Sequence, residues 1–129
     1  MNFAQIEEVY QALQRNGDVE FDYKNKSYAI EAAIDEDEKR YLEIWTADWK
    51  EGNYCLYREE TFLEQHIEKE VVDKVLNAKC FDLCGDFKMQ VLKSTAIPFE
   101  SKNSLAIFDG KSFVEIANDL ELTSIMGQD

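Results

Sequence analysis

Four side chains supply the groups best suited to metal or proton chemistry near neutral pH: Cys55, His66, Cys80 and Cys84. Cys80 and Cys84 are four residues apart and would share one face of a helix. Together with Cys55 and His66, they could complete the four ligands of a zinc ion. However, the spacing matches no standard zinc finger or ribbon, and Gly85 favours a loop. Because free cysteine is commonly buried, we interpret these thiols as buried groups and expect no metal site.

The sequence evidence for catalysis is weak. His66 would need an orienting partner and a nucleophile or substrate within reach, and its neighbours do not form the pattern of a known triad. The segment Gly110-Lys111-Ser112 resembles the end of a phosphate-binding loop, but the upstream glycine of that motif is missing. A turn followed by a helix N-cap explains Ser112. We therefore expect neither a cofactor nor catalytic residues, although an enzyme that uses carboxylates stays open as an alternative.

Charge is the strongest bulk feature of the chain, because 27 Asp and Glu residues oppose 14 Lys and Arg residues, for a net charge of −13 over 129 residues. Proteins that bind nucleic acid neutralise its phosphates with Lys and Arg, and anionic lipid attracts the same residues. The charge thus argues against direct binding to nucleic acid or to a membrane surface. Two interpretations stay open: a negative surface that maintains solubility, or a surface that binds a basic partner protein.

A pattern in the middle of the chain could form a binding surface. Leu42 and Ile44 alternate with aromatic and acidic residues, so a strand that turns these two toward a core turns the others to the opposite face. Carboxylates and rings on one face could receive Arg or Lys side chains through ion pairs and cation–π contacts. The predicted partner-binding residues are Tyr41, Glu43, Trp45, Tyr57, Glu20, Asp22 and Glu31. The alternative is that these rings pack against a later hairpin or the last helix.

Such a face requires a sheet, and the first half of the sequence predicts one. Apolar residues at positions 3, 6, 10 and 13 recur with helical spacing, and Asn16-Gly17 is a typical helix end. Alternating apolar residues then predict strands at 19–23, 28–34, 40–46 and 54–58, separated by short polar turns. Consecutive strands with short connections are expected to form an antiparallel meander.

The second half predicts two more helices and a hairpin. Thr61-Phe62-Leu63-Glu64 has the pattern of a capping box, and the apolar residues after it predict a helix over 61–77. Strands are predicted at 87–91 and 104–108, and a second capping box at 112–115 predicts a short helix. Residues 126–129 are predicted to be an unstructured tail. The order α-β-β-β-β-α-β-β-α predicts an α+β fold, a single domain over 1–129, with the helices against one face of the sheet.

Location and function follow as expectations. The N-terminus lacks a signal-peptide pattern, no apolar stretch approaches the roughly 18–20 residues of a membrane span, and an odd number of cysteines suits a reducing compartment. We expect a cytoplasmic interaction module without catalytic activity that binds a basic protein. The alternative is a small-molecule-binding protein or enzyme that uses carboxylates in a pocket between the sheet and helix 61–77. A homodimer formed through an edge strand is a third alternative.

Overall fold

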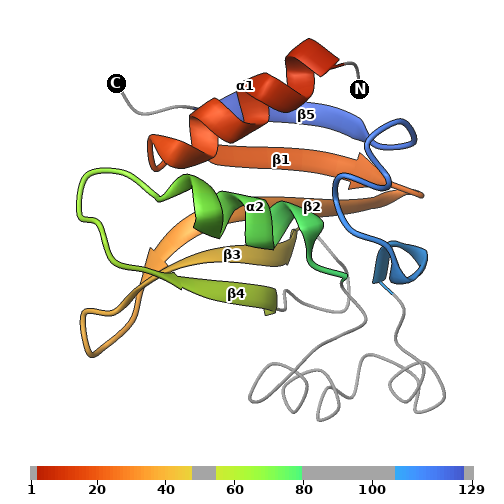
Figure 1. Cartoon of the computed structure of the whole chain (residues 1–129). Coiled ribbons are helices and arrows are strands. Elements are labelled where there is room, and N and C mark those ends of the chain that lie inside the picture. Colours follow the sequence, from red (N-terminus) through yellow and green to blue (C-terminus); the bar gives the residue numbers. More distant parts are fainter. Residues whose placement is uncertain (1–2, 48–54, 80–106, 127–129) are drawn as a thin grey trace, which may run out of the picture.

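The computed structural model describes residues 3–47, 55–79 and 107–126, which form an α+β fold. Its antiparallel sheet has the strand order β4-β3-β2-β1-β5. The strands are β1 (Asp18–Tyr23), β2 (Lys26–Ile34), β3 (Arg40–Ala47), β4 (Cys55–Thr61) and β5 (Glu121–Met126). The helices α1 (Phe3–Gln14) and α2 (Lys69–Asn77) lie against one face, α1 over β1 and β5 and α2 over β3 and β4 (Figure 1). Within these ranges, no helix has the length and apolar character that a membrane crossing needs.

The predicted meander of the first four strands is confirmed, because each strand from β1 to β4 pairs antiparallel with the next. The β1–β2 turn consists of Lys24 and Asn25, whose φ angles of 49° and 65° are those of a two-residue type I′ hairpin. In the β2–β3 turn, the Asp35 carboxylate accepts the backbone N–H groups of Asp37 at 2.8 Å and Lys39 at 2.9 Å. The acidic run that separates these strands is therefore a turn held by its own aspartate.

The hydrophobic core lies between the helices and the sheet. Alternate strand positions such as Phe21, Ile30 and Ile44 are fully buried, and they meet Leu13 of α1 and Leu76 of α2. Removing these side chains from water is the main favourable contribution to folding. The core cluster as a whole consists of Val9, Ala12, Leu13, Val19, Phe21, Tyr23, Tyr28, Ile30, Leu42, Ile44, Leu56, Ile67, Val71, Val72, Val75, Leu76, Phe108, Phe113, Ile116 and Leu120.

The helix predicted over 61–77 begins later, at Lys69, so the predicted start is wrong. Thr61 is still the last residue of β4, and residues 62–68 carry the chain from the sheet edge to the helix-covered face. The predicted capping box at Thr61 does not form, because the Thr61 hydroxyl donates to the Glu68 carboxylate instead. That carboxylate also accepts the backbone N–H of Phe62 at 2.9 Å. The connection is fixed to α1 by the Ile67 N–H, which donates to the Gln14 carbonyl at 2.9 Å.

The end of the described chain also departs from the predicted element order. The predicted strand at 87–91 lies outside the described residues, as does most of the one at 104–108, whose last two residues belong to a tight turn, Ile107–Gly110. The second capping box forms, since the Ser112 N–H donates to Glu115 at 3.1 Å and the Glu115 N–H donates to the Ser112 hydroxyl at 3.2 Å. However, residues 113–119 form successive turns, so the third helix is not confirmed. Met126, assigned to the tail, instead ends β5, a strand absent from the prediction.

Candidate functional site

The sheet face turned away from α1 and α2, here called the outer face, carries six of the seven predicted partner-binding residues. Because Leu42 and Ile44 are buried in the core, alternation places Tyr41, Glu43 and Trp45 on the outer face. The same argument places Glu20 and Asp22 of β1 and Glu31 of β2 there, because the residue before each of them along its strand is buried in the core. The register brings Glu31 directly opposite Glu43 on the neighbouring strand.

The predicted position of Tyr57 on the outer face is wrong, because Tyr57 lies opposite Ile44 and packs against the core cluster on the helix side of the sheet. The physical reason is a bulge in the β3–β4 pairing. Tyr57 pairs with Ile44, but the next pair joins Trp45 to Cys55, which leaves Leu56 as an extra residue. A bulge interrupts the alternation of side chains. Leu56 and Tyr57 therefore both face the core side, and Cys55 replaces Tyr57 on the outer face beside Trp45.

Glu43 is the centre of a packed polar cluster on this face and is only 2% exposed. Its Oε1 accepts the Trp45 indole N–H at 2.9 Å, and its Oε2 forms an ion pair with the Arg58 guanidinium at 2.8 Å. The Arg58 guanidinium in turn lies 4.2 Å from the centre of the Tyr41 ring. A buried carboxylate is tolerated when it is paired and hydrogen-bonded, as it is here. We call Tyr41, Glu43, Trp45, Cys55 and Arg58 the Glu43 cluster.

Beside this cluster, the outer face of β1 and β2 has unbalanced negative charge. The pKa of Glu31 is raised above its ordinary value, first by burial and then by the charges of Asp18, Glu43 and Glu20. Arg58, which lies two strands away on β4, is ion-paired with Glu43. The ionised form of Glu31 is therefore destabilised by both its burial and its neighbours.

Cys55 is a buried thiol, as the sequence interpretation expects for all three cysteines, although Cys80 and Cys84 lie outside the described residues. Burial and then the charge of Glu43 raise its pKa to about 12. At pH 8, such a pKa leaves roughly a thousandth of the thiolate of an ordinary cysteine. We expect iodoacetamide to leave Cys55 unmodified in the native protein and to alkylate it in concentrated urea, as measured by peptide mass spectrometry. Rapid alkylation of Cys55 without denaturant would contradict the described burial.

The other candidate chemistry does not assemble among the described residues. His66 is exposed, in the connection between β4 and α2, and Cys55 is buried on the outer face. In the part of the chain that the structure describes, no group of three or more His, Cys, Asp or Glu side chains is placed to hold a metal ion.

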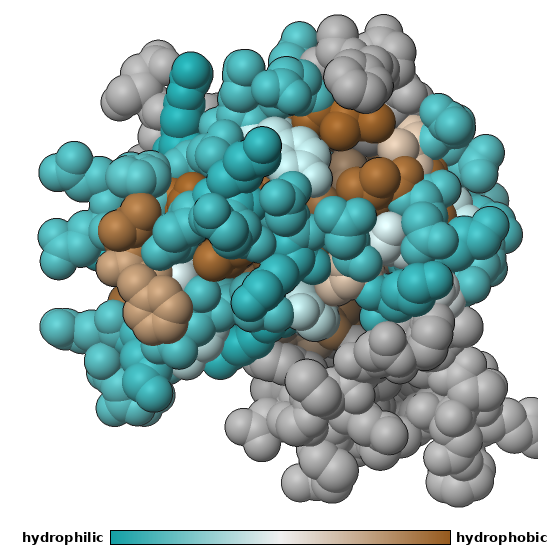
Figure 2. All heavy atoms as spheres, viewed as in Figure 1, coloured by the Kyte–Doolittle hydropathy of each residue, from teal (hydrophilic) through white to brown (hydrophobic). Residues whose placement is uncertain are grey.

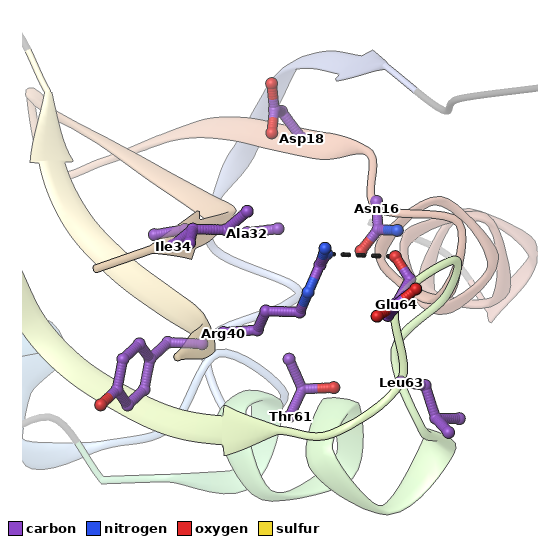
Figure 3. Close-up of a pocket in the computed structure, with 10 residues that line it drawn as sticks. Asn16, Asp18, Ala32, Ile34, Arg40, Thr61, Leu63 and Glu64 are labelled. Atoms are coloured by element: carbon purple, nitrogen blue, oxygen red, sulfur yellow. Dashed lines mark hydrogen bonds between the residues drawn. The ribbon is translucent and has the colours of Figure 1, made fainter. Parts of the chain in front are cut away.

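A cavity of about 570 Å³ opens at the end of the sheet where β2 ends and β3 begins (Figure 3). It lies between these strand ends, the α1–β1 turn and the connection that follows β4. Arg40 extends across it, and its Nη1 donates to the Glu64 carbonyl at 3.1 Å. The alternative hypothesis expected a pocket between the sheet and helix 61–77 in which carboxylates act. The described pocket instead touches that segment through Thr61, Leu63 and Glu64, and its central charge is Arg40.

Sequence reasoning missed both Arg58 and Arg40. The bulge in β4 exchanges which of its residues face the core and which face outward, and it turns Arg58 to the outer face. Alternation alone cannot identify such a bulge. Arg40 follows Lys39 at the end of a charged turn, where the sequence gives no sign of a pocket, and the lining of its pocket comes from four separate segments. Comparison with known proteins adds no assignment: no family model matches the chain, and no curated protein and no solved structure shows significant similarity to it.

Proposed function

We propose that this chain is a small cytoplasmic protein-interaction module without catalytic activity, and that its outer face binds a basic segment of a partner protein. The observation that carries the proposal is the crowding of Asp18, Glu20 and Glu43 around Glu31, which contributes to the raised pKa of Glu31. Ionised Glu31 is repelled by these neighbours. A Lys or Arg side chain placed among them would relieve that repulsion through charge-assisted hydrogen bonds.

The aromatic residues of the face support the same proposal. Trp45 lies opposite Ala29 and Tyr41 lies opposite Ala33, so each ring stands beside a small side chain on β2. The hydrogen bond from Trp45 to Glu43 and the contact between Tyr41 and Arg58 fix both rings before binding. Rigid aromatic anchors lose little conformational entropy when a partner binds.

A basic partner is favoured over a second copy of the chain. Two copies would each bring a net charge of −13 to the interface, and like charges oppose association at low salt. The outer face is also a sheet surface rather than a cavity, which suits a protein segment better than a small molecule. The reduced, buried thiol of Cys55 agrees with a cytoplasmic location.

The test compares two variants with the same change in net charge. The outer-face variant is Glu20→Gln with Glu31→Gln, and the matched control is Glu7→Gln with Glu8→Gln on the exposed surface of α1. The probe is a peptide of alternating Arg, Lys and Gly residues, titrated by calorimetry at low and at moderate salt. We expect the outer-face variant to weaken binding about tenfold and the control to change it less than about twofold, with weaker binding of all forms as salt rises.

Equal losses in the two variants would mean that the peptide responds to total charge, and the proposed face would be wrong. Tyr41 and Trp45 are unsuitable for this test because they support Arg58 and Glu43, so their replacement would disturb a buried ion pair as well as the surface. Glu20 and Glu31 form no side-chain hydrogen bond with the described residues of the Glu43 cluster. Their replacement by glutamine removes charge and preserves side-chain size.

A further inference from the structure

Exposed apolar side chains gather at the end of the sheet that holds the Arg40 pocket. Within the described residues, the large apolar side chains that are exposed are Ile34 at 60%, Phe62 at 76%, Leu63 at 39% and Met126 at 64%. Ile34 and Leu63 line the pocket, Phe62 precedes Leu63, and Met126 pairs with Asp18, which is also in the lining. Figure 2 shows apolar surface at this end, between the β2–β3 turn and the β4–α2 connection. Scattered apolar residues need no explanation, but a group around one cavity indicates a binding site.

The polar side of the same pocket is built around one cation. The Arg40 side chain lies in the cavity, with its guanidinium beside Asn16 (Figure 3). Its described hydrogen bond goes to a neutral acceptor, the Glu64 carbonyl. Among the residues that the structure describes, Arg40 is in no ion pair, even though acidic residues outnumber basic ones about two to one in the chain. A guanidinium has five N–H donors, so most of them remain for a ligand.

The pocket has the size of a small-molecule site. Its volume of about 570 Å³ lies within the range of roughly 300–1,000 Å³ typical of ligand pockets. Ala32, Ala33, Ile34 and Leu63 form apolar walls, and Asn16 and Arg40 supply polar groups on one side. Such a combination of an apolar wall with a few convergent polar groups orients a ligand that has a polar end and an apolar body.

We propose that this pocket binds a small organic carboxylate, with the carboxylate on the Arg40 guanidinium and the apolar body against Ile34 and Leu63. Arginine binds carboxylates through two parallel hydrogen bonds, which matches the donors that Arg40 presents. A singly charged anion is favoured over a phosphate dianion because Asp18 and Glu64 line the same cavity and the whole chain is strongly negative. This site shares Asp18 and Tyr41 with the border of the outer face, but it involves neither Glu20 nor Glu31.

The experiment is an amide NMR titration of the full chain with phenylacetate. We expect saturable shifts at residues 32–34, 40–41 and 61–64, with a dissociation constant of millimolar order or tighter. Acetate lacks the apolar body and phenethylamine carries the opposite charge, so both should bind at least about tenfold more weakly. Phenyl phosphate should also bind more weakly than phenylacetate. Arg40→Gln should raise the dissociation constant about tenfold, whereas Lys111→Gln, which removes an exposed positive charge outside the lining, should change it less than about twofold.

Three results would overturn the proposal. Shifts that do not saturate, or that map away from the pocket, would show that phenylacetate has no site there. Equal binding of phenethylamine would show apolar contact without recognition of the carboxylate. Equal or tighter binding of phenyl phosphate would refute the preference for a single charge. If Arg40→Gln disturbs the fold, Arg40→Lys serves instead: it keeps the charge and loses the planar fork, so it should bind phenylacetate several-fold more weakly. Unchanged affinity in Arg40→Lys would refute the bidentate contact.

Discussion

Replacing Phe21 with alanine should lower the free energy of unfolding by about 3–5 kcal/mol, the usual cost of removing a buried aromatic ring. Phe21 is fully buried and stands at the junction of three parts of the chain. Its ring centre lies 5.4 Å from that of Tyr28 in β2, 5.6 Å from that of Phe108 and 5.0 Å from that of Phe113. Removing the ring would leave a cavity between the sheet and the segment that leads to β5, and it would also remove edge-to-face contacts.

The measurement is urea unfolding followed by circular dichroism, with the midpoint and slope compared between variants. Phe62→Ala is the matched control, since it makes the same chemical change at a side chain that is 76% exposed. The control should shift the free energy of unfolding by less than about 0.5 kcal/mol. A loss below about 1 kcal/mol for Phe21→Ala would mean that residues 108–113 do not pack on the sheet as described.

The strands of the meander could be predicted because each buries one face, and burial of one face imposes a period of two on the sequence. The wrong face predicted for Tyr57 and the failure to predict β5 have a common physical cause, which is a break in the period of two. In β4, the bulge at Leu56 reverses the parity of Tyr57. In the β1–β5 pairing, Ser124 lies opposite Glu20 and Leu122 lies opposite Phe21, so the register shifts there. The apolar Leu122 and Ile125 of β5 are consequently three residues apart, a spacing that does not indicate a strand.

The start of α2 was mispredicted for a different reason. A capping box is a local pattern, and at Thr61 a longer-range partner, Glu68, takes the hydroxyl that the pattern assigns to the helix start. At Ser112 the local partners do form, but the turns that follow are set by packing of Phe113 and Ile116 into the core. The two capping-box patterns thus mark places where the chain changes direction. Tertiary packing decides whether a helix or a series of turns follows each of them.

The candidate face could be predicted only as a set of residues that share one side of the sheet. Alternation placed Tyr41, Glu43 and Trp45 together. It could not show that Glu43 would be buried, because that depends on the register that brings Arg58 opposite it. The binding of a basic partner remains a proposal, and its physical basis is the contrast between this satisfied carboxylate and the crowded, unsatisfied charge at Glu31.

Replacing Glu43 with alanine should be the most damaging change on the outer face, with an expected loss of about 2–4 kcal/mol. Removing one partner of a buried ion pair leaves the other charge uncompensated, and here it also removes the acceptor of the Trp45 N–H. Because the Arg58 side chain is 33% exposed, water can compensate part of its charge, which places the loss below the upper limit for a fully buried pair. Glu20→Ala, on the same face of β1, is the control and should cost less than about 0.5 kcal/mol.

A double-mutant cycle distinguishes the ion pair from simple loss of packing. If Glu43 and Arg58 stabilise the protein through each other, Glu43→Ala and Arg58→Ala combined should cost less than the sum of the single changes, by at least about 1 kcal/mol. Urea unfolding of the four proteins supplies these values. Additive losses would show that the pair is not coupled. The cycle also bears on function, because Trp45 and Tyr41 are oriented by this pair. A strong coupling energy would mean that the ion pair which stabilises the fold also holds two rings in place on the face that the helices do not cover. A preformed binding surface requires rings that are fixed in this way.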